Sequence, residues 1–138
     1  MRGVFADASY WVALLNPHDQ LHRRAHAVAG KLENADLVTT EFVLAEFLNF
    51  YAPRGAMLRS AAAELATRMF EDPRLEIVPS SRELFAAGLV LYRARRDKRY
   101  NLTDCISMVV MRGRALEQVL TQDRHFRQEG FATLLAGA

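Results

Sequence analysis

Residues 100–112 read Tyr-Asn-Leu-Thr-Asp-Cys-Ile-Ser-Met-Val-Val-Met-Arg, and residues 118–126 read Gln-Val-Leu-Thr-Gln-Asp-Arg-His-Phe. The first segment predicts a helix that is apolar on nearly every face, and the second begins with a short strand-like run. Each places an acid beside apolar residues: Asp104 opens the helix and Asp123 follows the strand. An ionised carboxylate beside a hydrophobic core is costly unless it is paired, hydrogen-bonded or bound to a metal. These two acids therefore predict partners elsewhere in the chain.

Short apolar runs alternate with helical segments along the chain. The predicted strands are 4–6, 37–39, 75–78, 118–121 and 132–135. The predicted helices are 10–15, 18–32, 41–51, 56–70, 81–96 and 103–114, with a helical turn at 124–129 and a capping box of Ser80 with Glu83 before the helix at 81. This alternation predicts an α/β fold, in which a short central parallel sheet of four to five strands is flanked by helices on both faces.

The composition is that of an ordinary globular protein. The chain has 138 residues, 51% of them hydrophobic and 25% charged, with a net charge of +2. We expect one domain, 1–138, which buries about two-thirds of its unfolded surface without disulfides or structural zinc. The lone Cys105 excludes a disulfide framework and a Cys-rich zinc site and fits a reducing cytoplasm. No uncharged apolar run approaches the length of a membrane span, so we expect a cytoplasmic protein with no membrane partner.

Two of the acids follow predicted strands. Asp7 comes directly after strand 4–6, and Asp123 comes after strand 118–121. Ligands of open parallel sheets bind beyond the carboxyl ends of the strands, so both acids are expected at the same edge. Taken singly, Asp7, Asp104 and Asp123 have an alternative interpretation as helix caps.

Glu46 has no such alternative, because it lies in the middle of a predicted helix. Its neighbours one turn away are Phe42, Val43, Asn49 and Phe50, of which all but one are apolar. A buried structural ion pair is the remaining alternative for this carboxylate.

Convergence of the four acids would require protons or cations. Two carboxylates about 4 Å apart repel by roughly 4 kcal/mol at an effective dielectric near 20. Hard oxygen ligands without His or Cys suit Mg²⁺ or Mn²⁺, which also bridge to substrate phosphates. The implied chemistry is phosphoryl transfer to water, with the metal activating the attacking water.

Four motifs together resemble the PIN domain family. They are residues 5–9 (Phe-Ala-Asp-Ala-Ser), 40–46 (Thr-Glu-Phe-Val-Leu-Ala-Glu), 102–106 (Leu-Thr-Asp-Cys-Ile) and 120–126 (Leu-Thr-Gln-Asp-Arg-His-Phe), followed by Glu-Gly-Phe at 129–131. Each motif alone is weak, but their order and spacing cover essentially the whole chain. The resemblance implies a PIN-like three-layer fold and a metal-dependent ribonuclease.

The resemblance also assigns roles by position. Mapped onto this chain, the family's acidic metal and catalytic residues are Asp7, Glu46, Asp104 and Asp123, with Ser9 and Thr121 as supporting polar groups. It implies Mg²⁺ or Mn²⁺ as the cofactor and RNA as the substrate. Compact PIN domains of this size resemble the toxins of VapBC-type toxin–antitoxin pairs, which implies a homodimer silenced by a small antitoxin protein.

A basic run precedes the acidic helix. It consists of Arg93, Arg95, Arg96, Lys98 and Arg99, interrupted by Asp97. As an isolated feature it reads as the solvated end of a helix, where cations complement the helix dipole. With an RNA substrate in view, the run is a candidate phosphate-binding segment, or a contact for an acidic antitoxin segment.

The histidines are interpreted as non-catalytic. His18, His22 and His26 recur every four residues, and we favour a solvated helix face over a transition-metal site. His125 is interpreted as a surface residue of a helical turn, with a role in proton transfer as the alternative.

Several apolar residues have a packing interpretation. Cys105 is expected to be a small buried residue of the core. Tyr10, Trp11 and Phe42 are expected to pack in the core, although aromatic side chains also stack on unpaired bases.

Three functions compete on this evidence. The leading hypothesis is a Mg²⁺- or Mn²⁺-dependent endoribonuclease that acts as a toxin. The rival is a non-catalytic PIN-like module that binds RNA or protein, in which the acids are caps and one buried ion pair. An aspartyl-phosphate phosphatase ranks last, because Ser9 occupies the place of the second acid that such an enzyme needs two residues after Asp7.

Overall fold

The structure is a computed structural model that describes residues 3–136. Its five strands form one sheet in the order β3-β2-β1-β4-β5, and every neighbouring pair is parallel. The strands are β1 (Val4–Ala6), β2 (Leu37–Thr40), β3 (Leu75–Val78), β4 (Gln118–Leu120) and β5 (Ala132–Thr133). All five predicted strands are therefore present, with ends that differ by up to two residues.

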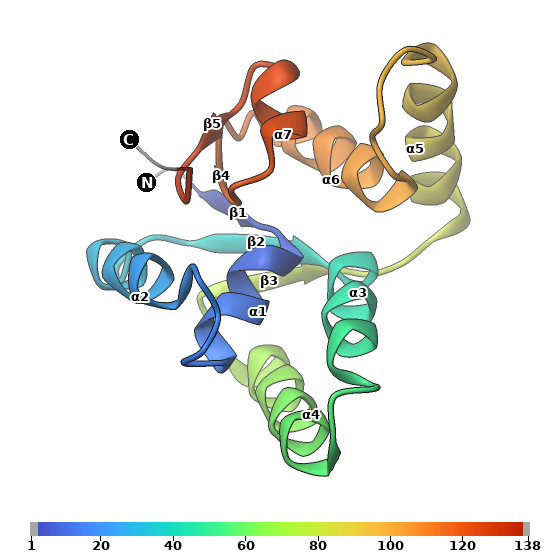
Figure 1. The fold of residues 1–138 in the computed structure, drawn as a ribbon. Helices are drawn as coiled ribbons and strands as arrows, with labels where there is room; N and C mark the ends of the chain where they lie inside the picture. The colour runs from blue at the N-terminus through green and yellow to red at the C-terminus, as the bar shows by residue number, and fades with distance from the viewer. Residues whose placement is uncertain (1–2, 137–138) are drawn as a thin grey trace.

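Seven helices in the described part of the chain cover this sheet. They are α1 (Ala8–Leu15), α2 (His22–Lys31), α3 (Glu41–Tyr51), α4 (Ala56–Glu71), α5 (Arg82–Ala94), α6 (Leu102–Gly113) and α7 (Arg124–Gln128). In Figure 1, α1 and α4 lie on one face of the sheet, and α5 and α6 lie on the other. The predicted three-layer α/β fold with a parallel sheet is confirmed.

The central strands are buried on both faces. Phe5 and Ala6 of β1 and Val119 and Leu120 of β4 have no exposed surface. Strands covered by helices on both sides need apolar residues at successive positions, which explains why these runs do not alternate with polar residues. The sheet is therefore a rigid base for the residues that follow each strand.

A close contact between α5 and α6 determines the position of the basic run. Gly88 of α5 faces Ile106 of α6, and a Cβ atom at position 88 would collide with the Ile106 side chain. Glycine lets these two helices approach closely, so the connection between them, residues 95–101, is held above the start of α6.

Two predicted helix starts, one helix end and one predicted cap were wrong. Helix α1 begins at Ala8, two residues before the predicted start. Helix α2 begins at His22, not at residue 18, because Asn16 and Asp19 side chains accept backbone N–H bonds two residues on and form turns. The cap of α5 is Ser81, which accepts from the Leu84 N–H, so the predicted box of Ser80 with Glu83 does not form.

The Ser80 hydroxyl instead donates to Glu41 Oε1 at 2.8 Å. Helix α5 ends at Ala94, two residues before the predicted end, because residue Arg95 has φ −106° and ψ 57° and leaves the helical region.

The strand order creates a switch point beside β1. From β1 the chain moves through β2 to β3 on one side, whereas β4 and β5 lie on the other side. Ligands of open α/β sheets bind at this kind of crevice, beyond the carboxyl ends of the two diverging strands. The two strands are β1, which Asp7 follows, and β4, which Asp123 follows.

None of the helices in residues 3–136 combines the length and apolarity that crossing a membrane requires.

Candidate active site

Asp7 is a buried acid at the end of β1. It occupies the cap position of α1, yet its side chain makes no capping hydrogen bond, so the cap interpretation is wrong for this residue. The residue is 6% exposed, and its Oδ2 accepts a hydrogen bond from Thr121 Oγ1 at 2.9 Å. Its Oδ1 is buried without a hydrogen-bond partner among the described residues. Such an oxygen needs a proton or a cation.

The two supporting hydroxyls lie against Asp7. Thr121 Oγ1 accepts from the Asp123 N–H at 3.1 Å and donates its one proton to Asp7. Ser9 Oγ lies 3.2 Å from the same oxygen, and because the Thr121 proton is already used, Ser9 is the donor in that bond. Thr121 therefore connects β1 to the loop that carries Asp123.

Asp104 opens α6 in a capping box with Asn101. Asn101 Oδ1 accepts from the Asp104 N–H at 2.7 Å, and Asp104 Oδ2 accepts from the Asn101 N–H at 3.3 Å. The cap interpretation of Asp104 is confirmed, and it does not exclude a role in the site. The same Oδ2 lies 3.3 Å from His125 Nδ1, so the capped carboxylate also faces α7.

Asp123 and His125 complete a compact cluster with Asp104. Asp123 caps α7 through the His125 N–H at 2.9 Å, as predicted. His125 Nδ1 lies 3.3 Å from Asp123 Oδ1 and equally far from Asp104 Oδ2. Because both neighbours are acceptors, Nδ1 carries the proton in this arrangement. Each of these three side chains offers one ligand atom, and the atoms lie within 4.8 Å of one another.

The interpretation of His125 as a surface residue was therefore wrong. Its side chain is 24% exposed and joins two acids, and its ring lies 5.2 Å from that of the buried Tyr100. The only signal in the sequence was its position two residues after Asp123.

Glu46 reaches the site from α3. It is half-buried, and the described residues provide no ion pair for it, so the alternative of a buried structural ion pair is not supported. Burial raises the pKa of Glu46, and the charge of Asp104 raises it further, whereas a hydrogen bond with Asn101 lowers it. Asn101 thus contacts both Asp104 and Glu46.

The electrostatics connect all four acids. Burial, followed by the charge of Asp104, raises the pKa of Asp7 from 3.8 to about 7, and Glu46 adds to the effect. Burial and then the Asp123 charge raise the pKa of Asp104, although His125 opposes this. The fold therefore brings the four predicted acids together, and their negative charges are incompletely compensated within the protein.

The donor set fits a divalent cation. Clustered carboxylates are the hard oxygen ligands that Mg²⁺ and Mn²⁺ prefer, and the unpartnered Oδ1 of Asp7 provides a free ligand atom. Asp104, Asp123 and His125 form the group whose ligand atoms lie within 4.8 Å of one another, and Asp7 and Glu46 could complete the ligand set around an ion.

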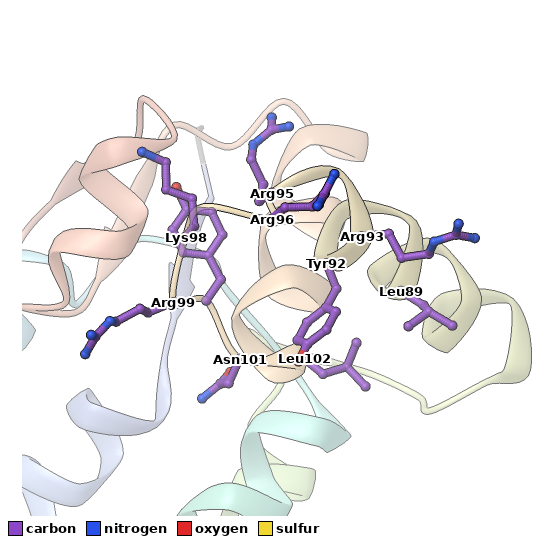
Figure 2. A pocket seen from close by; sticks show the side chains of 10 residues that line it. Leu89, Tyr92, Arg93, Arg95, Arg96, Lys98, Arg99, Asn101 and Leu102 are labelled. Carbon is purple, nitrogen blue, oxygen red and sulfur yellow. The ribbon is translucent and has the colours of Figure 1, made fainter.

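The basic run lines a cavity of about 1120 Å³ between the end of α5 and the start of α6. Figure 2 shows its side chains around the 95–101 connection. Arg95 is committed elsewhere: its Nε and Nη2 donate to the two carboxylate oxygens of Glu129 at 2.7 and 3.1 Å. Arg93, Arg96, Lys98 and Arg99 are exposed.

Glu129 was not predicted as the centre of a network. Its side chain is 6% exposed and accepts from Arg95, from Arg112 at 2.8 Å and from the Tyr100 hydroxyl at 3.0 Å. These donors, led by Arg95, hold the pKa of Glu129 at about 2. This fully paired carboxylate fixes the segment that carries Tyr100 and Asn101.

The remaining histidines hold α2 against α1. His22 Nδ1 lies 2.8 Å from the Ala13 carbonyl and His26 Nε2 lies 3.2 Å from the Leu14 carbonyl, so these two are not merely solvated. His18 is exposed. No group of potential metal ligands found in residues 3–136 includes these three histidines.

The packing predictions for Cys105, Tyr10 and Trp11 are confirmed, because all three are buried. Phe42 is half-buried, with its ring 6.4 Å from that of Phe85.

The comparisons with known proteins agree with this geometry. The PIN domain model matches residues 4–131, which is nearly the whole chain. The chain belongs to the PIN domain family. The match contains all four acids of the site, Asp7, Glu46, Asp104 and Asp123.

Similar proteins include relatives from two strains of Mycobacterium tuberculosis. The chain is 30% identical over 128 residues to the 23S rRNA-specific endonuclease VapC20 of strains CDC 1551 / Oshkosh and ATCC 25618 / H37Rv, covering 93% of this chain and 95% of the relative. It also resembles a crystal structure titled as VapC20, a sarcin-ricin loop cleaving toxin, with a TM-score of 0.78 and 23% identity over 94% of this chain and 96% of the other. That structural likeness supports the PIN fold.

Proposed function

We propose that this PIN domain is a metal-dependent endoribonuclease that hydrolyses RNA phosphodiester bonds and acts as the toxin of a VapBC-type toxin–antitoxin pair. The observation that carries the proposal is the convergence of four acids from four separate segments on one edge of the sheet, with one buried oxygen of Asp7 unpartnered. The endonuclease name of relatives that align over almost the full chain supports the same activity.

The chain's residues would act by binding and orientation. When Mg²⁺ or Mn²⁺ is bound, it supplies Lewis acidity that activates water and compensates charge on the phosphate. Asp7 is fixed by Thr121, Asp104 by Asn101, and Asp123 by its cap on α7, so each carboxylate is positioned before substrate arrives. Fixed ligands of this kind avoid reorganisation during the reaction.

The remaining assignments belong to the same proposal. A homodimer, a small antitoxin partner and a cytoplasmic location follow from the VapC-type resemblance. Exposed apolar side chains of α3 and α4, Phe50, Met57 and Phe70, are available for such protein contacts, with 39%, 87% and 61% exposed surface. The five cations of the basic run are the proposed RNA contacts, with Arg95 restricted by Glu129.

Two observations disagree with the non-catalytic alternative. It treats the acids as caps and one buried ion pair, but Asp7 makes no cap bond and no ion pair is found for Glu46 within residues 3–136. In the phosphatase alternative, Ser9 offers only a hydroxyl hydrogen-bonded to Thr121.

The test is cleavage of RNA by the purified protein. We expect endonucleolytic products with Mn²⁺ or Mg²⁺ and none with EDTA. The substrate named for the relatives makes a ribosomal RNA hairpin the first RNA to try, next to an unstructured RNA of equal length. RNA binding without cleavage under every metal condition would favour the non-catalytic module.

A further inference from the structure

All the charged residues that line the cavity beside the acids are cations. Its described residues are Leu89, Tyr92, Arg93, Arg95, Arg96, Lys98, Arg99, Tyr100, Asn101 and Leu102, which include five cations and no carboxylate. Clustered cations without acids attract anions.

Most of these cations are available to a ligand. Arg95 is held by Glu129, and Lys98 lies 3.8 Å from Asp97, whose side chain is 79% exposed. Arg93, Arg96 and Arg99 are exposed and form no ion pair within the described part of the chain. Guanidinium groups suit phosphate because their donors match two phosphate oxygens at once.

The same cavity has an exposed aromatic face. Tyr92 of α5 is 50% exposed and Leu89, one turn earlier, is 43% exposed. Figure 2 shows the Tyr92 side chain projecting toward Leu102. A half-exposed aromatic ring among cations is a surface on which a nucleobase stacks.

The cavity borders the acidic site through Tyr100 and Asn101. Asn101 lines the cavity, and its Oδ1 accepts from the Asp104 N–H in the capping box. Tyr100 also lines it, and its ring lies 5.2 Å from His125. An RNA strand in the cavity would therefore lie next to the acids, because a single residue, Tyr100 or Asn101, separates the cavity from them.

We infer that this cavity binds the single-stranded RNA segment next to the scissile phosphate, with Tyr92 stacking on an unpaired base and Arg93, Arg96 and Arg99 binding backbone phosphates. The inference rests on the proposed ribonuclease function and adds the position of the strand and the stacking residue. An acidic peptide would satisfy the charges but has no need of the Tyr92 ring, so the aromatic face favours RNA.

The experiment measures RNA binding separately from cleavage. Fluorescence anisotropy of a labelled single-stranded RNA of about 12 nucleotides, in EDTA, reports affinity without hydrolysis. Cleavage is measured with Mn²⁺ on a dinucleotide that is too short to fill the cavity. The full chain is used for wild type, Tyr92→Ala, Tyr92→Phe and the triple variant Arg93→Gln/Arg96→Gln/Arg99→Gln.

The controls match each change in type. Phe70→Ala removes an exposed aromatic ring from α4, outside the cavity. The triple variant Arg23→Gln/Arg68→Gln/Arg74→Gln removes three exposed charges that do not line the cavity. Sedimentation of every variant reports its oligomeric state.

We expect Tyr92→Ala to weaken RNA binding about tenfold and Tyr92→Phe to retain it, because stacking needs the ring and not the hydroxyl. The cavity arginine variant should lower the slope of log affinity against log salt by about 2, at about 0.7 for each phosphate contact. Dinucleotide cleavage should stay unchanged in the Arg23→Gln/Arg68→Gln/Arg74→Gln control, whose residues lie outside the cavity.

Other outcomes would overturn the inference. If the cavity variants bind RNA as their matched controls do, the RNA does not bind in this cavity. If the wild type still cleaves the dinucleotide in that case, the proposed ribonuclease function is unaffected. A wild-type dimer that Tyr92→Ala converts to monomers, with unchanged RNA affinity, would assign the cavity to a second copy of the chain. Equal binding of poly-glutamate, lost in Tyr92→Ala, would assign it to an acidic protein. Absence of any metal-dependent cleavage by the wild type would instead reject the proposed function.

Discussion

The protein contains a cluster of four acids at the sheet edge and a separate single carboxylate, Glu129, and the two have opposite electrostatics. At the sheet edge, burial and mutual repulsion raise the pKa of Asp7 to about 7 and leave one of its oxygens unpartnered. At the far end of α7, Glu129 receives two arginines and a tyrosine, and its pKa is held at about 2.

The difference distinguishes a candidate functional site from a carboxylate with a structural role. Glu129 is satisfied by the protein alone, so its role is to hold segments together. The acids around Asp7 repel one another and are incompletely compensated, an arrangement that persists because the surrounding fold fixes them. Only the acids around Asp7 call for a cation from outside the protein.

The largest expected effect is on activity at the uncompensated cluster. Asp104→Asn should lower metal-dependent RNA cleavage by on the order of a thousandfold, because removing a ligand charge costs several kcal/mol of transition-state stabilisation. Asparagine keeps a side-chain oxygen for the capping box with Asn101, so α6 should remain folded, as circular dichroism can verify. Full cleavage by this variant would show that the reaction occurs elsewhere.

The next effect is a difference in pH dependence. The folded pKa of Asp7 lies above its ordinary 3.8, so the folded state binds more protons between pH 4 and 7, and metal-free stability should fall as pH rises through that interval. The separation from 3.8 to about 7 corresponds to about 4 kcal/mol. Denaturant unfolding in EDTA should show this decline in the wild type and a flatter profile in Asp7→Asn.

Glu129 should behave in the opposite way. Its folded pKa of about 2 lies below 4.5, so its contribution is complete above pH 4.5 and is lost as pH falls toward 2. The exposed Asp97→Asn serves as the control for both pH ranges. Equal slopes in wild type and Asp7→Asn between pH 4 and 7 would contradict the burial and repulsion assigned to Asp7.

Glu129→Gln should affect stability and spare the metal site. Loss of the charge weakens the bonds from Arg95, Arg112 and Tyr100, which should lower the melting temperature by roughly 5–10 °C. The exposed Glu64→Gln on α4 is the matched control and should change little. A larger loss of Mn²⁺ affinity than of stability would mean that Glu129 belongs to the site and is not only a support.

His125→Asn tests the residue that links Asp104 to Asp123. Its Nδ1–H lies 3.3 Å from an oxygen of each, so removing the ring should weaken Mn²⁺ binding roughly tenfold, the lower range for residues that orient metal ligands. His18→Asn, an exposed change of the same type, should have no effect. Unchanged Mn²⁺ affinity in His125→Asn would show that His125 does not contribute to metal binding.

The sequence predicted the layers and the acids because both depend on local patterns. Apolar runs such as Val4–Ala6 identify buried strands, and the position of Asp7 directly after such a run places it at the sheet edge whatever the details of packing. Glu46 stood out because a charge within an apolar helix has few explanations.

What the sequence could not predict depends on contacts between distant segments. The pairing of Arg95 with Glu129 joins residues 34 positions apart, and no local pattern distinguishes Arg95 from the other cations of the run. His125 looked like a surface residue because its two partners come together only when α6 and α7 pack. The Ser81 cap of α5 differed from the predicted Ser80 by one residue, a choice decided by the bond from Ser80 to Glu41.

A calorimetric titration of Mn²⁺ into the purified protein, at a pH above 7 where Asp7 is ionised, tests the proposed metal site most directly. We predict saturable binding by the wild type and by Glu129→Gln, and its loss in Asp7→Asn. Equal Mn²⁺ binding by Asp7→Asn and wild type would contradict the claim that the clustered acids form a metal site.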